Sequence, residues 1–237
     1  MILAFFDFET TDKDPSTARI TDAAVALVDS ETQKIIQTFA SNTWDESYEK
    51  IHPTAAAITG LSDEFIEKYG IPPRYALANF GTCMARAEYC VAHNGRAYDL
   101  PLLREELKRN SMELAIPANI DTRYDLDFPE HIDTRKLSYL AAEHGILASS
   151  AHSALGDVLT MKDLFFKYDI NRTIELSKSP EIWVKAGVTF DTRELAKERK
   201  YSWFPNDKVW AKQIKELFIE KEALAPFSIT LLAAPPK

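Results

Sequence analysis

The sequence predicts an α/β fold in which helices pack on a mixed sheet, followed by a small α+β appendage. Strand patterns fill the first forty residues, helical periodicity follows with one short strand inside it, and the composition changes near Ser177. Strands followed by helices around a returning strand favour a layered α/β structure. The 237 residues are 46% apolar and 27% charged, which suits a soluble protein with a sizeable core.

Three strands are predicted near the N-terminus, where apolar residues form runs or alternate. Ile2 to Phe8 is an apolar, aromatic run, Ile20 to Asp29 is rich in alanine and valine, and Lys34 to Ala40 alternates. Their close succession favours a meander. A fourth, short and buried strand is predicted at Tyr89 to Ala92.

Helices are predicted where the apolar period lengthens from Thr54 onward. Proline at an early position of one helix and glycine after the end of another agree with the usual preferences at helix ends. The predicted helices are Glu64–Tyr69 opened by Asp63, Tyr75–Ala87, a segment beginning at Pro101, Arg135–His144 ended by Gly145, and Ser153–Tyr168.

The net charge and the cysteines limit the class of protein. A formal charge of −8 argues against a protein that coats nucleic acid through charge alone, although it allows a local basic groove. The two cysteines, Cys83 and Cys90, suggest reduced, partly buried thiols and a cytoplasmic location. The N-terminus lacks a basic targeting region and no apolar run is long enough for a membrane span, so no membrane partner is expected.

The composition predicts two domains, residues 1–177 and residues 178–237. The last 59 residues, 179–237, contain three of the four tryptophans and carry 10 basic against 8 acidic side chains. The part of the chain before them is strongly acidic. Within this appendage we expect a strand at Val188–Asp191, a helix at Arg193–Lys197, and a hairpin of Tyr201–Trp203 with Lys208–Trp210. Aromatic and basic residues together suit a platform for single-stranded nucleic acid. Alternatively, the tryptophans build the core of a small lid.

Acidic residues follow two of the predicted strands. Asp7 and Glu9 are two positions apart on the first strand, so their side chains project from the same face. Asp99 comes shortly after the Tyr89–Ala92 strand, where a helix begins. Taken singly, the pair could be solvated at a strand end, and Asp99 could be a helix cap.

A histidine and a fourth acid enter the last predicted helix of the main domain. His152 and Asp157 are five positions apart, a rotation of about 140° on a helix, so they cannot share one helical face. We therefore place His152 on the loop before the helix, although a surface histidine and a helix-start aspartate would explain the same spacing. If the four acids cluster, they require a cation. Oxygen ligands suit Mg²⁺ or Mn²⁺, two such ions can promote phosphodiester hydrolysis, and an imidazole is a base near neutral pH.

These motifs resemble the DEDDh (DnaQ-like) exonucleases, the superfamily of proofreading subunits and RNase T-like enzymes. Within that superfamily the sequence looks closest to the three-prime repair exonucleases (TREX), through the segments 56–62, 92–103 and 152–159. The resemblance implies a ribonuclease H-like fold with a mixed five-stranded sheet. The sequence departs from the TREX branch in three ways: Phe8 and Thr10 differ from its first motif, no proline lies between Ile20 and His52, and no C-terminal apolar anchor follows. The partners, membrane attachment and dimerisation of that branch are therefore not carried over.

The resemblance also implies roles for individual residues. Asp7 would bridge two Mg²⁺ ions, Glu9 and Asp157 would complete one site, and Asp99 would help to hold the second ion, partly through water. Mn²⁺ would substitute for Mg²⁺. His152 would deprotonate the attacking water.

A second group of residues is implied to bind the substrate. Thr10 and Thr11 would contact the terminal nucleotide, Ile58 and Leu61 would pack against the last bases, and Asn94 would lie near the scissile bond. Each of these five residues could equally serve in core packing or in a turn.

The expected function is removal of nucleotides from DNA 3′ ends, with single strands or 3′ overhangs preferred. One alternative is an RNA-trimming exoribonuclease of the same fold, because the same chemistry cleaves either backbone. Others are a non-catalytic nucleic-acid-binding module and a proofreading subunit that depends on a polymerase. The sequence does not specify an oligomeric state.

Overall fold

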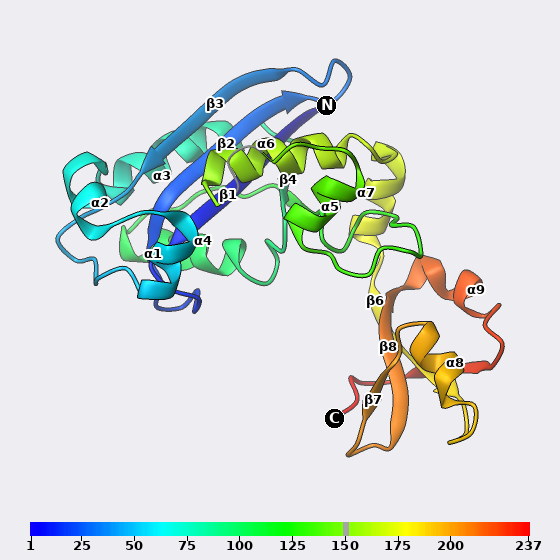
Figure 1. The fold of residues 1–237 in the computed structure, drawn as a ribbon. Coiled ribbons are helices and arrows are strands. Elements are labelled where there is room, and N and C mark those ends of the chain that lie inside the picture. The colour runs from blue at the N-terminus through cyan, green and yellow to red at the C-terminus, as the bar shows by residue number, and fades with distance from the viewer. Residues whose placement is uncertain (149–151) are drawn as a thin grey trace. The chain divides into compact units, whose positions relative to one another are not determined.

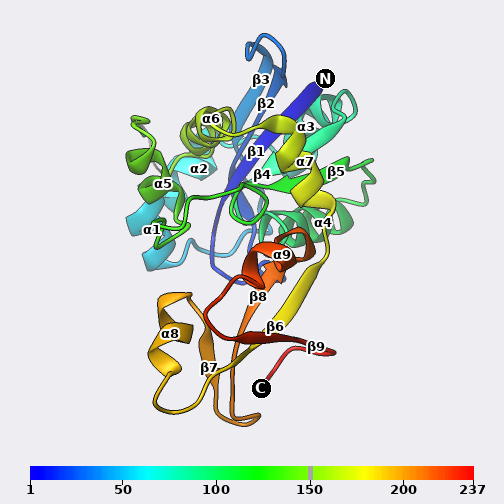
Figure 2. The ribbon, with the colours of Figure 1, turned by 90° about the vertical axis from the view of Figure 1, so that its right-hand side faces the viewer.

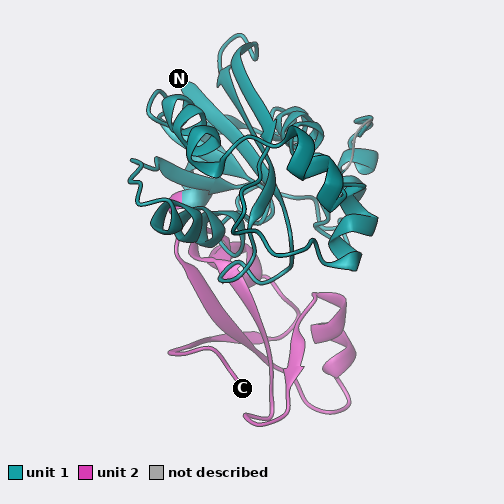
Figure 3. Cartoon of the chain, turned by 90° about the vertical axis from the view of Figure 1, so that its left-hand side faces the viewer, with its two compact units in different colours: residues 1–177 teal, residues 178–237 magenta. Residues whose placement is uncertain are grey.

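The computed structural model describes residues 1–148 and 152–237 of the chain. These residues form two compact units, Met1–Ser177 and Lys178–Lys237, which are coloured separately in Figure 3. The first unit contains a five-stranded mixed sheet flanked by helices, which confirms the predicted fold class. Across the described ranges, the helices are too short or too polar for any of them to traverse a lipid bilayer.

The first sheet has the strand order β3-β2-β1-β4-β5 (Figures 1 and 2). The first three strands form an antiparallel meander, and the last two run parallel to β1. The pairing of β1 with β4 covers only Leu3–Phe5 of β1, so the second half of β1 extends past the end of β4. The strands are β1 (Ile2–Thr10), β2 (Ile20–Asp29), β3 (Ile35–Asn42), β4 (Tyr89–Ala92) and β5 (Ala118–Asp121).

Helices cover both faces of this sheet, because successive apolar residues of β1 point to opposite sides. Phe6 and Phe8 pack in one core with α3 and α4, whereas Leu3 and Phe5 pack in the other with α5, α6 and α7. Figures 1 and 2 show α3 and α6 on opposite faces. The helices are α1 (Pro53–Thr59), α2 (Asp63–Tyr69), α3 (Pro73–Met84), α4 (Asp99–Arg109), α5 (Leu137–Glu143), α6 (Ala154–Phe165) and α7 (Ile170–Lys178).

Most predicted elements are confirmed, with shifted ends. The helix predicted from Tyr75 begins at Pro73, and the helix predicted over Arg135–His144 begins only at Leu137. In unit 1, β5 and α7 are not among the predicted elements. The four residues of β5 include only Ile120 as a large apolar side chain, so they carry almost no periodic signal.

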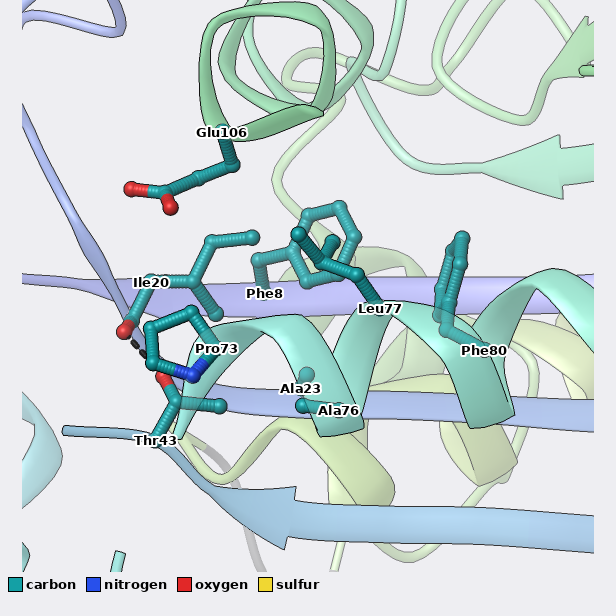
Figure 4. A pocket seen from close by; sticks show the side chains of 9 residues that line it. All are labelled: Phe8, Ile20, Ala23, Thr43, Pro73, Ala76, Leu77, Phe80 and Glu106. Carbon is teal, nitrogen blue, oxygen red and sulfur yellow. Dashed lines mark hydrogen bonds between the residues drawn. The ribbon is translucent and has the colours of Figure 1, made fainter. Parts of the chain in front are cut away.

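The face of the sheet under α3 contains a buried charged group beside a small cavity of about 10 Å³ (Figure 4). Glu106 is fully buried there and accepts hydrogen bonds from Arg19 at 2.6 Å and Arg109 at 2.9 Å. Phe8 also lines the cavity. A void of this size holds at most about one water molecule, so it is not a ligand site.

Unit 2 is built on a four-stranded antiparallel sheet with the order β7-β8-β6-β9. The predicted hairpin and helix are confirmed, but the strand predicted over Val188–Asp191 is wrong. The strand lies just before it, because Ile182, Val184 and Ala186 alternate into the unit's core, whereas Phe190 is exposed. The elements are β6 (Glu181–Gly187), α8 (Arg193–Glu198), β7 (Ser202–Phe204), β8 (Val209–Lys215), η1 (Glu216–Phe218), α9 (Ile219–Glu222) and β9 (Ser228–Leu232).

The tryptophans of unit 2 divide between its core and its surface. Trp203 and Trp210 are cross-strand partners with ring centroids 5.7 Å apart. Trp210 packs against the core, whereas 47% of Trp203 is exposed. Trp183 meets Phe204 edge to face at 5.5 Å. Trp210 thus packs as the core interpretation predicts, and Trp203 has the exposed ring that a platform for bases would need.

Candidate active site

Two carboxylates project from the end of β1 toward α6. Asp7 and Glu9 share one face of the strand, and the intervening Phe8 points into the opposite core. In the antiparallel pairing with β2, Asp7 lies opposite Ala24 and Glu9 lies opposite Asp22. Both carboxylate side chains are half-buried.

The first turn of α6 brings a third carboxylate to the same place. This helix begins after Ser153, whose hydroxyl accepts a hydrogen bond from the Gly156 amide at 3.2 Å. Asp157 follows in the first turn, and Asp7, Glu9 and Asp157 each offer an oxygen within 4.8 Å of the others. Residues 150 positions apart in sequence thus form one group of oxygen atoms.

Asp99 is placed by the loop after β4. It is the first residue of α4 and is only 4% exposed, and burial raises its pKa to about 7 against a smaller lowering effect of the Phe8 backbone amide. This amide is available because β1 extends past β4. Asp99 stands outside the group of three, yet its charge is the largest Coulombic influence on Asp7.

The cluster is strongly acidic. Burial, and after it the charge of Asp157, raises the pKa of Glu9 to about 8. Burial, followed by the charge of Asp99, raises the pKa of Asp7 well above its usual value. Within the described residues, no lysine or arginine forms an ion pair with the four acids. A bound cation would satisfy this excess of negative charge.

His152 lies immediately before Ser153 in the segment leading into α6 and is exposed. Its backbone adopts a left-handed conformation, with φ of 64°. Its backbone amide and its charge both act to lower the pKa of Asp157, although burial, the largest effect, raises that pKa overall. His152 therefore adjoins the carboxylate cluster. Ala151, which precedes it, lies outside the described residues.

The two threonines after Glu9 are engaged within the protein. The Thr10 hydroxyl lies 2.8 Å from the Tyr98 hydroxyl and donates to the Asp12 carbonyl at 2.7 Å. Thr11 is 5% exposed, and its hydroxyl and backbone amide both bond to the backbone of Arg19. These contacts fix the loop after β1.

The two apolar residues predicted to meet the bases lie at the end of α1. Ile58 is 48% exposed, and Leu61 is half-buried beyond Gly60, which has φ of 72° and closes the helix. A left-handed conformation of this kind favours glycine. Ile58 thus presents apolar surface to solvent.

Asn94 is held by an acid that sequence reasoning missed. Its backbone has φ of 68°, its amide donates to Asp121 at 2.9 Å, and its side chain accepts from the Tyr124 hydroxyl at 3.3 Å. Asp121 is fully buried at the end of β5 and also accepts from the amides of Arg96 and Arg123. Its position at a strand end was the only available signal. This network shapes the loop that leads to Asp99.

Asp22 was missed as well. It lies on β2 opposite Glu9 and contributes to the raised pKa of both Asp7 and Glu9. The pattern of β2 alone gave no reason to select this residue, because the register between the strands decides which carboxylates meet.

Comparison with known proteins gives one family. The exonuclease family RNase_T matches residues 4–165. None of the curated proteins matches this chain. Among solved structures, E. coli exonuclease I in complex with a dT13 oligonucleotide is similar with a TM-score of 0.61 and 18% identity, covering 81% of this chain and 49% of that one.

Two further structures agree. The complex of E. coli exonuclease I with a dA16 oligonucleotide gives a TM-score of 0.66 and 18% identity, over 88% of this chain and 53% of that one. A product-bound exonuclease I gives a TM-score of 0.63 and 15% identity, over 98% of this chain and 62% of that one. The chain thus spans about half the length of the E. coli exonuclease I chains.

The structural similarity confirms the expected ribonuclease H-like exonuclease fold. The closer likeness to the TREX branch stays a prediction. The family match covers most of unit 1, including the four clustered acids and His152. The chain therefore belongs to the RNase_T family of exonucleases, within the DEDDh superfamily.

Proposed function

We propose that this chain is a metal-dependent 3′–5′ exonuclease that hydrolyses phosphodiester bonds at DNA 3′ ends and releases 5′-mononucleotides. The observation that carries the proposal is the convergence of Asp7, Glu9 and Asp157, with oxygen atoms within 4.8 Å of one another and Asp99 beside Asp7. A purely structural cluster of acids would be expected to include a basic partner.

The donor set fits Mg²⁺, or Mn²⁺ in its place, because every side chain offers hard carboxylate oxygen. Asp7, Glu9 and Asp157 would hold one ion, and Asp7 with Asp99 would hold a second. When bound, two such ions supply Lewis-acid stabilisation of the attacking and leaving oxygens. The protein's own contribution is to hold the four carboxylates at fixed positions on β1, α4 and α6.

His152 would act as the general base. Its imidazole is exposed at the entrance to α6, five residues before Asp157. An imidazole there can take a proton from the attacking water and release it to solvent near neutral pH. The backbone around His152 would orient the ring, since the position lies next to the Ser153 cap of the helix.

Substrate contacts would come from the loops around the cluster. Ile58 offers exposed apolar surface that would pack against the last bases, together with the half-buried Leu61. Asn94 would lie near the scissile bond. Thr10 and Thr11 would act mainly through the shape of the loop they stabilise, because both hydroxyls are already bonded within the protein.

Single-stranded DNA is the preferred substrate in this proposal. The similar exonuclease I structures contain dT13 and dA16 oligonucleotides, and this supports DNA over the RNA-trimming alternative. Unit 2 would serve as an accessory module, with the half-exposed Trp203 as one stacking surface for bases. A domain boundary between residues 177 and 178 would then separate chemistry from accessory binding.

The decisive experiment digests 5′-labelled and 3′-labelled single-stranded DNA with and without Mg²⁺, beside matched duplex DNA and RNA. The proposal expects immediate release of the 3′ label and a descending ladder from the 5′ label, with neither signal from Asp7→Ala. Faster cleavage of RNA than DNA would favour the exoribonuclease. Binding without cleavage in Mg²⁺, and also when Mn²⁺ replaces it, would favour the non-catalytic module.

A further inference from the structure

Asp22 and Glu9 form a like-charge pair that does not stabilise the sheet. It lies directly opposite Glu9 in the antiparallel pairing of β1 with β2, so both side chains project from the same face. Like charges opposite each other destabilise a sheet. The polar side chain at this position therefore requires another explanation.

The explanation lies in the contact of Asp22 with α6. One carboxylate oxygen of Asp22 accepts a hydrogen bond from the backbone amide of Ala154 at 3.1 Å. Ala154 is the first residue of α6, where the amides have no partner inside the helix. A carboxylate is favourable here because it also meets the positive end of the helix dipole.

This contact falls between two residues of the candidate active site. Ala154 lies two positions after His152 and three before Asp157. The Ser153 hydroxyl caps the helix through a local contact with Gly156. Asp22, in contrast, connects the first turn of α6 to strand β2. Asp22 lies outside the group of three acids whose oxygens approach within 4.8 Å.

We infer that Asp22 is a positioning residue, whose hydrogen bond to Ala154 holds the first turn of α6 against the sheet so that Asp157 and His152 face Asp7 and Glu9. This inference rests on the proposed function, because it assigns Asp22 a part in aligning the same site. The essential property is the hydrogen-bond acceptor, and the negative charge is secondary. A displacement of about 1 Å at such a site lowers the rate about a hundredfold.

The test compares Asp22→Ala with Asp22→Asn. The alanine variant loses the acceptor, whereas asparagine keeps an oxygen at the same position. For single-stranded DNA with Mg²⁺, we expect kcat of Asp22→Ala to fall about 10- to 100-fold with KM changed less than about threefold. Asp22→Asn should stay within about fivefold of wild-type kcat.

A second measurement does not depend on activity. Hydrogen–deuterium exchange of the segment 152–158 should be faster in Asp22→Ala and close to wild type in Asp22→Asn, because the Ala154 amide loses its partner only in the former. Thr173→Ala is the matched control. It removes a buried hydroxyl that bonds the Asp169 carbonyl in α7, and should lower thermal stability while sparing kcat and exchange at α6.

The outcomes separate the inference from the function on which it rests. Wild-type kcat or unchanged exchange in Asp22→Ala overturns the positioning role while leaving an active enzyme. Equal damage in both Asp22 variants also overturns it, and assigns Asp22 to the charged, metal-binding set. A wild-type protein that cuts no DNA refutes the proposed function instead, and the exchange data then still decide whether Asp22 holds α6.

Discussion

Replacing Glu9 by glutamine should stabilise the metal-free protein and remove much of its response to Mg²⁺. The pKa of Glu9 rises from 4.5 to about 8 on folding, because of burial and the neighbouring acids. The folded state therefore binds this proton more tightly than the unfolded state. Stability contributed by the protonated group is lost as the pH rises from about 4.5 through about 8, and glutamine avoids that loss.

The magnitude follows from the shift. The shift from 4.5 to about 8 corresponds to about 5 kcal/mol of free energy of unfolding, of which about 4 kcal/mol is expressed at pH 8. We halve this to about 2 kcal/mol because Glu9 is partly open to solvent. For a unit of 177 residues, this predicts a rise in Tm of about 4–8 °C. Mg²⁺ at about a hundredfold its Kd would stabilise the wild type by about 3 kcal/mol.

Thermal unfolding at pH 8 in EDTA and in Mg²⁺ measures both effects. Glu9→Gln should unfold at higher temperature than the wild type in EDTA, gain less from Mg²⁺, and lack nuclease activity. The control is Glu31→Gln, an exposed acid after β2, which should change neither Tm nor activity. The reasoning is refuted if Glu9→Gln is no more stable in EDTA at pH 8, or if Mg²⁺ stabilises it as much as the wild type.

Three further predictions follow from individual side chains. His152→Ala should lower kcat about 10²–10⁴-fold in single-turnover digestion while DNA binding in EDTA is retained; loss of binding would contradict its role as base. Glu106→Ala should cost about 3–5 kcal/mol in urea unfolding because it removes the buried carboxylate that pairs with both Arg19 and Arg109, whereas the more exposed Glu105→Ala should cost less than about 1 kcal/mol. Ile58→Ala should raise KM for single-stranded DNA about threefold to tenfold at unchanged kcat, whereas Ile36→Ala, equally exposed on β3, should not.

The main elements of unit 1 could be predicted because their patterns are local. The apolar run of β1 specifies a buried strand, and the period of two places Asp7 and Glu9 on one face. The five-residue spacing of His152 and Asp157 requires one of them to lie outside the helix, and His152 does precede α6. Short elements such as β5 carry too few residues for this kind of inference.

The supporting residues could not be predicted, because tertiary contacts define them. Asp22 meets Glu9 only through the register of β2 on β1, and reaches Ala154 only once α6 has docked. Asp121 gathers three backbone amides from two loops. The burial of Thr11 likewise depends on the return of the chain at Arg19. None of these arrangements leaves a period or a spacing in the sequence.

The order of the acids along the chain has a consequence for biosynthesis. Asp7 and Glu9 come first along the sequence, on β1, Asp99 follows α3 and β4, and Asp157 comes last, in α6. A ribosome-bound fragment that ends before α6 contains the central strand yet lacks one carboxylate of the centre and its histidine. Any nuclease activity of this centre therefore requires that nearly all of unit 1 has been synthesised and that α6 has docked on the sheet.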